Sequence, residues 1–281
     1  MSVLVTGSRG FLGRRLLSTL SSHWGEQVHG VTTGTPSHPR EHQCDLRDAS
    51  AVAELLDLLQ PRHIYHLAGS YSNVFETDWA NNVLAAKNIL DHLANTGSDA
   101  RLLVIGSAAE YGWVAPGDNP IDENHPPRPV SFYGLTKLYQ THLSQFYARA
   151  RSIRVVVARV FNLCGPGASE RLFVGNVERQ FSAFRAGRIA SIRVGNLDAF
   201  RDYLSVDEAA RLLMRVLERG KSGEIYNVGS GFPIQMRELL DHLLQEVGLD
   251  WSIVQEVERR NPTGVDVDTI YADIRKLQSL Q

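Results

Sequence analysis

The sequence is poor in cysteine, has no long apolar run and is nearly neutral in charge. Cys44 and Cys164, its two cysteines, are too few and too far apart for a disulfide framework or a zinc site. No stretch approaches the roughly 18 consecutive apolar residues that a membrane-spanning helix needs, and the N-terminus lacks the basic segment of a signal peptide. The formal net charge of −2 gives no electrostatic reason to expect nucleic acid or an anionic membrane as a partner. These absences favour a soluble protein in a reducing cytoplasm.

Across the 281 residues, apolar segments of strand length alternate with amphipathic helical segments. The strand segments are continuously apolar, which is typical of a parallel sheet buried on both faces. The pattern predicts an α/β fold of the Rossmann type, a doubly wound parallel sheet with helices on both faces. The expected strands are Val3–Val5, Gln27–Thr32, His63–His66, Leu102–Ile105 and Ile153–Ala158, and the expected helices are Phe11–Ser21, Ala49–Leu59, Trp79–Asn95 and Phe132–Arg149.

The rhythm changes after Asn162, where residues 163–168 indicate a glycine-rich loop. We expect residues 1–162 to form a dinucleotide-binding domain that is rejoined by about 201–230. Residues 163–200 and 231–281 are expected to form a small α/β substrate-binding lobe. Its expected elements, with those that rejoin the first domain, are a helix at Val174–Ala186, a strand at Ser191–Val194, strand-plus-helix pairs at Tyr203–Arg219 and Ile225–Val247, a strand at Trp251–Val257 and a helix at Asp268–Leu277.

Tyr133 and Lys137 stand one helical turn apart, so both side chains leave the same face of a helix. An ammonium beside a phenol favours the phenolate and lowers the tyrosine pKa from its usual value of about 10. Such a phenol can exchange a proton with an alcohol or a carbonyl near neutral pH. The pattern is short, however, and an aromatic residue and a lysine on an ordinary half-exposed helix also produce it.

A glycine-rich loop lies directly between the first expected strand and the first expected helix. Gly7 permits a tight turn, Gly10 allows the backbone to approach a pyrophosphate, and Gly13 allows the helix to pack closely on the strand. The order of strand, glycine loop and helix predicts dinucleotide binding. The loop residues expected to contact the cofactor are Gly7, Arg9, Gly10, Phe11, Leu12 and Gly13.

The second expected strand ends at Thr32 without the carboxylate that commonly holds the adenosine ribose of NAD. Its absence removes repulsion against a 2′-phosphate, and Arg9 could supply the matching cation, although Arg9 could equally be a solvated loop residue. We therefore expect NADP(H) to be favoured and NAD(H) to be possible. Asp45 and Leu46 are placed to meet the adenine, while Asp45 could instead cap the helix that begins at Ala49.

In order along the chain, these residues resemble the extended short-chain dehydrogenase/reductase family of nucleotide-sugar enzymes. The glycine loop and the Tyr133–Lys137 pair fall on two of its motifs, and Ser107 stands four residues before Tyr111-Gly112, as the family's catalytic serine or threonine does. The resemblance implies that Leu67, Ala68, Gly69 and Asn82 lie at the cofactor. It also implies that Asn162, in the segment 159–167, and Arg201, in the segment 201–206, contact a nucleotide-sugar substrate. Arg260 would be a second phosphate-binding arginine, and it precedes a D-x-x-K motif at Asp273–Lys276.

The chemistry that the resemblance implies needs three side chains. Ser107 ends a central strand at the carboxyl edge, where open α/β sheets bind ligands. It and its neighbour Ala108 would meet the sugar, Tyr133 would donate a proton, and nicotinamide would deliver the hydride. Lys137 would hold the nicotinamide ribose and keep Tyr133 acidic.

Departures from the family motifs narrow the reaction. The 4,6-dehydratases follow their serine or threonine with an Asp-Glu pair, and the 3,5-epimerase-reductases place a cysteine two residues after it, whereas here Ala108 and Ala109 follow Ser107. Neither alanine can transfer a proton, which leaves 4-keto reduction or 4-epimerisation. The whole-chain pattern is most similar to the GDP-4-keto-6-deoxy-mannose reductases and related nucleotide-4-keto-6-deoxysugar reductases. A 4-epimerase with bound NAD is the alternative, and a non-catalytic cofactor-sensing relative is disfavoured because Tyr133 and Lys137 are both present.

Helices 79–95 and 132–149 are long and carry apolar residues. These residues either all face the sheet of their own chain or pair across a two-fold axis, and the family resemblance implies a homodimer through both helices. They include Leu84, Ile89, Leu138, Leu143 and Phe146.

Overall fold

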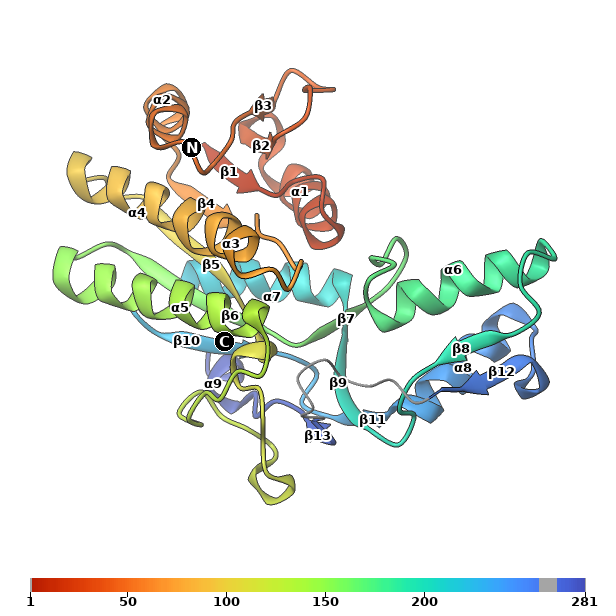
Figure 1. The fold of residues 1–281 in the computed structure, drawn as a ribbon. Helices are drawn as coiled ribbons and strands as arrows, with labels where there is room; N and C mark the ends of the chain where they lie inside the picture. The colour runs from red at the N-terminus through yellow and green to blue at the C-terminus, as the bar shows by residue number, and fades with distance from the viewer. Residues whose placement is uncertain (1, 258–266, 281) are drawn as a thin grey trace.

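A parallel sheet of seven strands forms the centre of the computed structural model, which describes residues 2–257 and 267–280 (Figure 1). The spatial order of the strands is β10-β6-β5-β4-β1-β2-β3, and every neighbouring pair is parallel. The order reverses at β1, which confirms the predicted doubly wound fold of the Rossmann type. The strands are β1 (Val3–Thr6), β2 (Val28–Thr32), β3 (Glu41–Gln43), β4 (His63–His66), β5 (Arg101–Ser107), β6 (Val155–Val160) and β10 (Ile225–Val228).

Helices cover both faces of this sheet. The helices α1 (Phe11–Trp24) and α7 (Val206–Arg219) pack on one face, and α2 (Ala49–Leu59), α4 (Ala85–Thr96) and α5 (Phe132–Arg151) pack on the other (Figure 1). Successive side chains of a strand point to opposite faces. The central strands are therefore apolar at nearly every position, because each face has its own buried core.

The helix expected at 79–95 begins earlier and changes its winding. It starts as α3 (Phe75–Asp78), continues as a π-helical turn over Trp79–Leu84 and becomes α4. Single π-helical turns inside helices are frequent at functional sites. Here the turn contains the buried side chain of Asn82.

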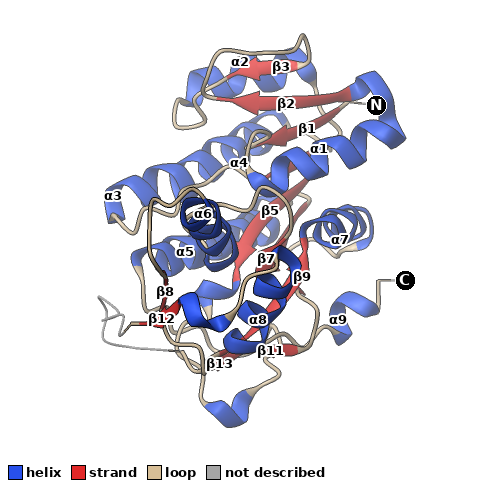
Figure 2. Ribbon diagram, turned by 90° about the vertical axis from the view of Figure 1, so that its right-hand side faces the viewer, coloured by secondary structure: helices blue, strands red, loops and turns tan. Residues whose placement is uncertain are grey.

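The second half of the chain adds a smaller lobe beside the main sheet (Figure 2). Its α6, β8, α8 and β12 share a separate apolar core. A four-stranded sheet in the order β11-β9-β13, with β7 also paired to β9, joins this core to the main domain. The elements are β7 (Asn162–Cys164), α6 (Phe173–Arg185), β8 (Ile192–Val194), β9 (Phe200–Ser205), β11 (Pro233–Gln235), α8 (Met236–Val247), β12 (Val254–Glu256), β13 (Thr269–Ile270) and α9 (Arg275–Gln278).

Several predictions for this half were wrong in detail. The segment 268–277 is not one helix, because Thr269 and Ile270 pair with β9 and Ala272 bridges to Ile121, which leaves only the four-residue α9. The strand expected at 251–257 is reduced to β12 after a 3₁₀ turn, and the expected loop after Asn162 begins as β7. In the first half, the edge strand β3 was not predicted. No helix in the described parts of the chain is long and apolar enough to cross a membrane.

Candidate functional site

A cavity of about 230 Å³ opens at the carboxyl edge of the sheet, between the loops that follow β1 and β4 and the end of β5. The topological reversal at β1 places it where open α/β sheets bind their ligands. Of the residues predicted to meet the cofactor, six line it together. The lining is Leu12, Leu67, Gly69, Ser70, Tyr71, Asn82, Ile105, Gly106, Tyr133 and Lys137.

The glycine loop forms a close backbone turn at one end of this cavity. Gly7 has a φ of +66°, and the Gly10 nitrogen donates to the Gly7 carbonyl at 2.9 Å. A Cβ on Gly13 would lie 2.1 Å from the Gly7 oxygen, so no larger residue fits there. Gly10 is the N-cap of α1 and has no side chain to cap it. The helix N-terminus is therefore open to an anion, as pyrophosphate binding requires.

The loop arginine is paired with a carboxylate that the sequence did not predict. Arg9 Nε and Nη2 donate to the two Glu41 carboxylate oxygens at 2.7 and 2.6 Å. Glu41 belongs to β3, the strand that pairs with β2, so the carboxylate comes from the neighbouring strand and not from β2 itself. As expected, β2 itself ends without a carboxylate, and the Thr32 hydroxyl at its end accepts from the Gly34 nitrogen at 3.1 Å. A carboxylate is nevertheless present beside Arg9, because Glu41 supplies it from β3.

Asp45 and Leu46 follow β3 at the same edge. The Asp45 carboxylate binds Arg47, which holds the Asp45 pKa at about 2. Asp48, and not Asp45, caps α2 by accepting from the backbone nitrogens of Ser50 and Ala51, so the alternative role considered for Asp45 is wrong. Leu46 is buried, and its carbonyl accepts from Asn88 at 2.9 Å.

The segment after β4 is fastened to α5 by Asn82. The Asn82 side chain accepts from the Ser70 nitrogen at 2.8 Å and donates to the Thr136 hydroxyl at 3.0 Å. The nitrogen of Ala68 donates to the Thr6 hydroxyl at 3.1 Å, which ties Leu67–Gly69 to the end of β1. Asn82 thus supports the cavity floor from within the π-helical turn.

The three predicted catalytic side chains lie close together, and two of them, Tyr133 and Lys137, line the cavity. Tyr133 lies on the first turn of α5, and its phenol forms a hydrogen bond with Ser107 at the end of β5. The Ser107 hydroxyl also accepts from the Ala109 nitrogen at 3.2 Å. One turn along α5, Lys137 Nζ donates to the carbonyl of Ile105 and, at 2.6 Å, to Gln140.

Burial dominates the ionisation of this group. Burial raises the pKa of the Tyr133 phenol to about 12, against the opposing effect of the hydrogen bond to Ser107. Burial also lowers the pKa of Lys137 to about 8, against the attraction of the Glu110 carboxylate. The structure contradicts the prediction that Lys137 lowers the Tyr133 pKa, because the ammonium is turned to Ile105 and Gln140. Tyr133 is accordingly a protonated phenol at neutral pH, which is the form that donates a proton.

A buried ion pair that the sequence analysis missed lies behind Ser107. The Glu110 carboxylate accepts from the Ser107 nitrogen at 2.8 Å, from Thr141 at 2.9 Å and from Arg159 at 2.8 and 3.0 Å. The Arg159 guanidinium also lies 4.3 Å from the centre of the Tyr111 ring. Glu110 is therefore engaged in the core and is not a free acid next to Ser107. The sequence signal that could have pointed to this ion pair is the position of Arg159 at the start of the R-x-x-N segment.

The residues expected to contact substrate are more scattered. Ala108 follows Ser107 in a 3₁₀ turn, Asn162 donates to the Asp202 carbonyl at 3.0 Å, and Arg201 donates to the carbonyls of Phe200 and Asp268. Arg260 lies outside the described residues. The structure brings Ala108 next to the catalytic group but shows Asn162 and Arg201 bonded to the backbone of the second lobe.

Two further side chains extend the site toward the second lobe. The ring of Tyr71 meets that of Tyr133 edge to face at 4.7 Å, and Arg171 donates to the Tyr71 carbonyl at 3.4 Å. Arg171 also lines a cavity of about 90 Å³ beside α6, together with Asn176 and Arg193. Tyr71 therefore links Tyr133 to Arg171, which lines the cavity beside α6.

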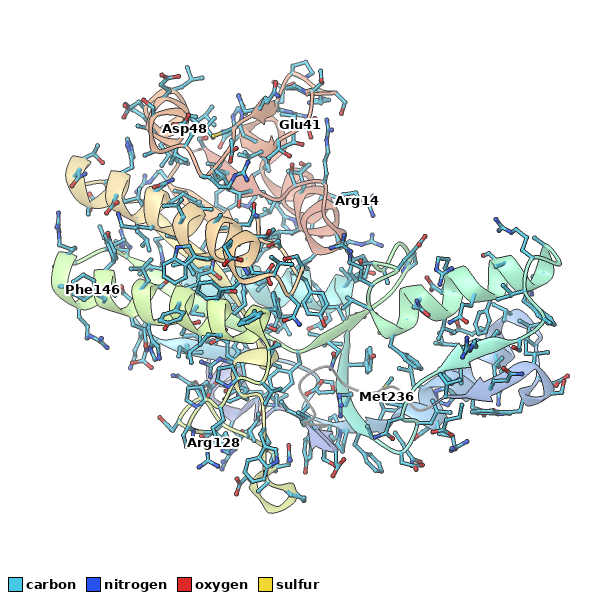
Figure 3. All side chains as sticks on the ribbon, in the orientation of Figure 1. Arg14, Glu41, Asp48, Arg128, Phe146 and Met236 are labelled. Atoms are coloured by element: carbon cyan, nitrogen blue, oxygen red, sulfur yellow. The ribbon has the colours of Figure 1, made fainter. Side chains whose placement is uncertain are left out.

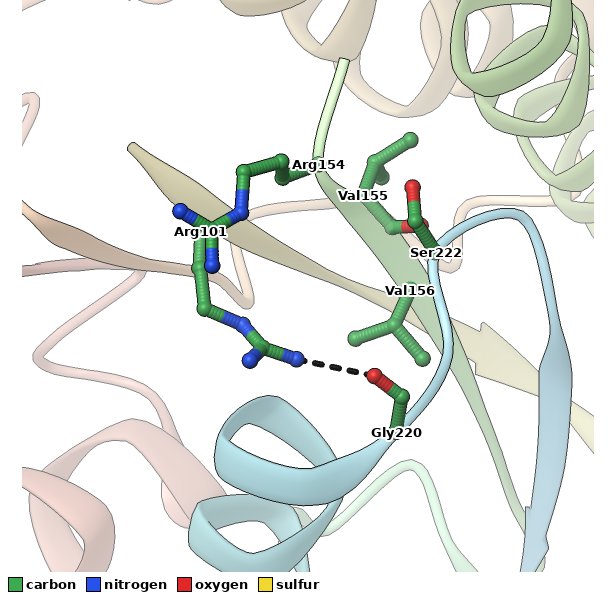
Figure 4. A pocket seen from close by; sticks show the side chains of 6 residues that line it. All are labelled: Arg101, Arg154, Val155, Val156, Gly220 and Ser222. Carbon is green, nitrogen blue, oxygen red and sulfur yellow. Dashed lines mark hydrogen bonds between the residues drawn. The ribbon is translucent and has the colours of Figure 1, made fainter. Parts of the chain in front are cut away.

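Another cavity, of about 210 Å³, lies at the opposite edge of the sheet, where β5 and β6 begin (Figure 4). Arg101 and Arg154 line it, and Arg101 donates to the Gly220 carbonyl at the end of α7 at 2.8 Å. An arginine at a helix C-terminus stabilises the helix. None of the predicted site residues that the structure describes lines this cavity.

Comparison with known proteins places the chain among nucleotide-sugar enzymes. The family described as NAD dependent epimerase/dehydratase matches residues 3–229. The GDP-6-deoxy-D-mannose reductase of Pseudomonas aeruginosa is 32% identical over 92% of this chain and 84% of its own. A structure of RMD from Pseudomonas aeruginosa complexed with NADPH is 28% identical, has a TM-score of 0.85 and covers 100% of this chain and 92% of its own. The Thermus thermophilus UDP-glucose 4-epimerase in complex with NAD is 26% identical, has a TM-score of 0.86 and covers 99% and 92%.

Proposed function

Because the chain belongs to the NAD dependent epimerase/dehydratase family, we propose that it reduces the 4-keto group of a nucleotide-linked 4-keto-6-deoxyhexose with NAD(P)H. The observation that carries the proposal is the composition of the catalytic group. Tyr133 and Lys137 line one cavity and Ser107 lies next to Tyr133, while the next two residues after Ser107 are alanines and Glu110 is bound to Arg159. The similarity to a GDP-6-deoxy-D-mannose reductase supports the same reaction.

In this proposal two of the three side chains handle the carbonyl oxygen. Bound NAD(P)H supplies the hydride that reaches the carbonyl carbon. The Ser107 hydroxyl donates a hydrogen bond to the carbonyl oxygen, and Tyr133 transfers its proton to that oxygen as the alcohol forms. Tyr133 then regains a proton from solvent. Lys137, whose ammonium is turned away from the phenol, would hold the nicotinamide ribose.

The residues around the glycine loop fit a dinucleotide. The turn at Gly7 and Gly13 leaves no room for side chains, and the open N-terminus of α1 suits a pyrophosphate. NADP(H) remains favoured because β2 ends without a carboxylate, with NAD(H) possible. The residues that would hold the cofactor are Gly7, Arg9, Gly10, Phe11, Leu12, Gly13, Thr32, Asp45, Leu46, Leu67, Ala68, Gly69, Asn82, Tyr133 and Lys137.

The nucleotide part of the substrate is assigned to the second lobe, formed by residues 163–200 and 231–281. Ser107, Ala108, Asn162, Arg201 and Arg260 remain the proposed substrate contacts. The cavity beside α6 supports adding Arg171 and Arg193, because guanidinium groups bind phosphates through paired hydrogen bonds.

A second candidate is a nucleotide-sugar 4-epimerase that retains NAD. The ion pair between Arg9 and Glu41 favours it, because a neutralised arginine offers less to a 2′-phosphate. The similarity to the NAD-bound epimerase supports the same alternative. Both reactions use the same serine, tyrosine and lysine.

The proposed assembly is a homodimer through α3, the π-helical turn, α4 and α5. An aromatic patch, defined as Phe75, Trp79, Phe132 and Tyr139, joins these helices through ring contacts of 5.4 to 5.8 Å. Trp79, Phe132 and Tyr139 are exposed in the single chain, and so is Phe146 on the outer side of α5 (Figure 3). Exposed apolar patches of this kind are typical of protein interfaces.

The deciding experiment mixes the purified chain with NADPH or NADH and with GDP-, dTDP-, UDP- and CDP-linked 4-keto-6-deoxysugars, and follows the absorbance of reduced nicotinamide. We expect consumption with at least one sugar. Tyr133→Phe should lose activity by about 10²- to 10⁴-fold and keep cofactor binding, whereas Tyr139→Phe on the same helix should stay active. No consumption, together with interconversion of UDP-hexoses without added cofactor, would replace the reductase with the epimerase.

A further inference from the structure

The ion pair between Arg9 and Glu41 spans the strand β2. Arg9 stands in the glycine loop after β1, whereas Glu41, labelled in Figure 3, opens β3 on the far side of β2. Their two hydrogen bonds, at 2.7 and 2.6 Å, run side by side from Nε and Nη2 to the two carboxylate oxygens. This paired geometry is the strongest that an arginine and a carboxylate form.

The loop between β2 and β3 closes around the pair. Glu41 Oε2 accepts from the Ser37 nitrogen at 2.8 Å and from the Ser37 hydroxyl at 3.1 Å, and Arg9 Nη2 donates to the Thr35 carbonyl at 2.6 Å. The hydrogen bonds from Arg9 and Ser37 hold the pKa of Glu41 at about 2, so the carboxylate is ionised at neutral pH. The Glu41 side chain is 12% exposed and that of Arg9 is 45% exposed, so a ligand can approach from the arginine side.

One edge of the guanidinium remains available for such a ligand. Within residues 2–257 and 267–280, no group accepts a hydrogen bond from Arg9 Nη1. This nitrogen would lie 3.2 Å from a Cβ built on Gly34, just beyond the end of β2. A dinucleotide held by the glycine loop brings its adenosine ribose to this end of the second strand. Arg9 therefore meets the ribose with its charge already balanced by Glu41.

We propose that Glu41 is a selectivity-determining residue, which weakens the binding of a 2′-phosphorylated adenosine ribose relative to the free ribose diol. A phosphate monoester carries between one and two negative charges at neutral pH. Glu41 repels these charges and occupies the two arginine donors that would otherwise form a paired contact with the phosphate. The chain consequently accepts NAD(H) beside NADP(H). The inference rests on the proposed use of NAD(P)H, and it concerns the adenosine end of the cofactor, away from Tyr133.

The test uses 2′,5′-ADP and 5′-AMP, which carry the adenosine end without nicotinamide. Isothermal titration calorimetry on the full chain should show that Glu41→Gln tightens 2′,5′-ADP by about tenfold and changes 5′-AMP by less than about twofold. The exposed Glu26, in the turn before β2, provides a control that removes the same charge at the other end of the strand, and Glu26→Gln should change neither affinity. In Arg9→Ala/Glu41→Gln the gain over Arg9→Ala should be limited to the lost repulsion, because no arginine donors are released.

Unchanged 2′,5′-ADP binding in Glu41→Gln would overturn the inference, and weaker binding would show that Glu41 instead holds Arg9 ready for the phosphate. These outcomes leave the proposed reductase untouched, because both nucleotides still bind. If the unaltered chain binds neither nucleotide, the proposed cofactor-dependent function fails together with the inference.

Discussion

The Glu110 carboxylate binds the Arg159 guanidinium at 2.8 and 3.0 Å inside the core and also accepts the peptide N–H of Ser107. Breaking a buried pair leaves an uncompensated charge, which costs about 3–5 kcal/mol. We expect Arg159→Met to lower the free energy of unfolding by about this amount. Urea denaturation measures the loss, and Lys87→Met, which removes the exposed pair with Asp91, should cost no more than about 1 kcal/mol. A loss below about 1 kcal/mol for Arg159→Met would contradict the prediction.

The buried ammonium of Lys137 predicts a specific dependence of stability on pH. Its pKa is about 8 in the folded chain and 10.5 ordinarily, so the unfolded chain binds more protons between these values. The contribution of Lys137 to stability therefore rises with pH across this window, by about 3 kcal/mol in total. The stability advantage of Lys137→Met over the unaltered chain should shrink correspondingly between pH 7 and about 10.5. The exposed Lys221→Met serves as control, and an advantage that is constant with pH would refute the prediction.

A substitution at Gly13 tests whether the glycine loop binds the cofactor. A Cβ at this position would lie 2.1 Å from the Gly7 oxygen, so Gly13→Ala must displace the turn. We expect cofactor binding, measured by calorimetry with NADPH, to weaken by at least about tenfold, and the melting temperature to fall. Gly117→Ala introduces the same methyl group where nothing lies within 4 Å, and it should behave like the unaltered chain. Normal binding by Gly13→Ala would argue against this loop as the cofactor site.

Arg171 tests the link from Tyr133 into the second lobe. Loss of a charge-assisted contact to substrate phosphate costs about 1.5–3 kcal/mol, so Arg171→Ala should lower kcat/KM by about tenfold or more, mainly through KM. Steady-state kinetics with the best substrate found would measure this. Arg179→Ala, on the neighbouring α6 but absent from the lining of this cavity, should leave KM unchanged. Equal KM values for the two variants would remove Arg171 from the substrate site.

The aromatic patch tests the proposed dimer. Tyr139 is 46% exposed and its ring meets Trp79, so a charge there would be buried unpaired at the interface. We expect Tyr139→Glu to convert a dimer into a monomer in analytical ultracentrifugation. Leu58→Glu places the same charge on α2, where Leu58 is 73% exposed, and should stay dimeric. A monomeric unaltered chain would end the proposal.

The sequence predicted best where a short segment decides its own structure. The segments Ala49–Leu59 and His63–His66 were predicted to the residue. The helix begins directly after its cap residue Asp48, and the strand is only four residues long. The segment 268–277 was predicted wrongly because pairing with the distant β9 determines its backbone. Glu41 escaped notice for the same reason, since only the three-residue β3 brings it to Arg9.

For the catalytic group too, the sequence predicted which residues lie together but not all of their contacts. Helical spacing placed Tyr133 and Lys137 together, and the order of motifs placed Ser107 beside them. The direction of the Lys137 ammonium could not be derived from spacing, because it depends on a carbonyl of β5 and on Gln140. The Glu110–Arg159 pair joins residues from two neighbouring strand ends, and only the three-dimensional register of β5 and β6 reveals it.

The position of β10 late in the chain leaves one edge of β6 uncovered during synthesis. The strand β6 is fully buried and consists mostly of valine, and one of its two edges is covered by β10, which follows the whole of α6 and α7 in the chain. A ribosome therefore exposes an apolar strand edge until Ile225–Val228 has emerged. Uncovered edges of this composition pair readily with other chains. We thus expect aggregation chiefly of nascent or truncated products that end between β6 and β10.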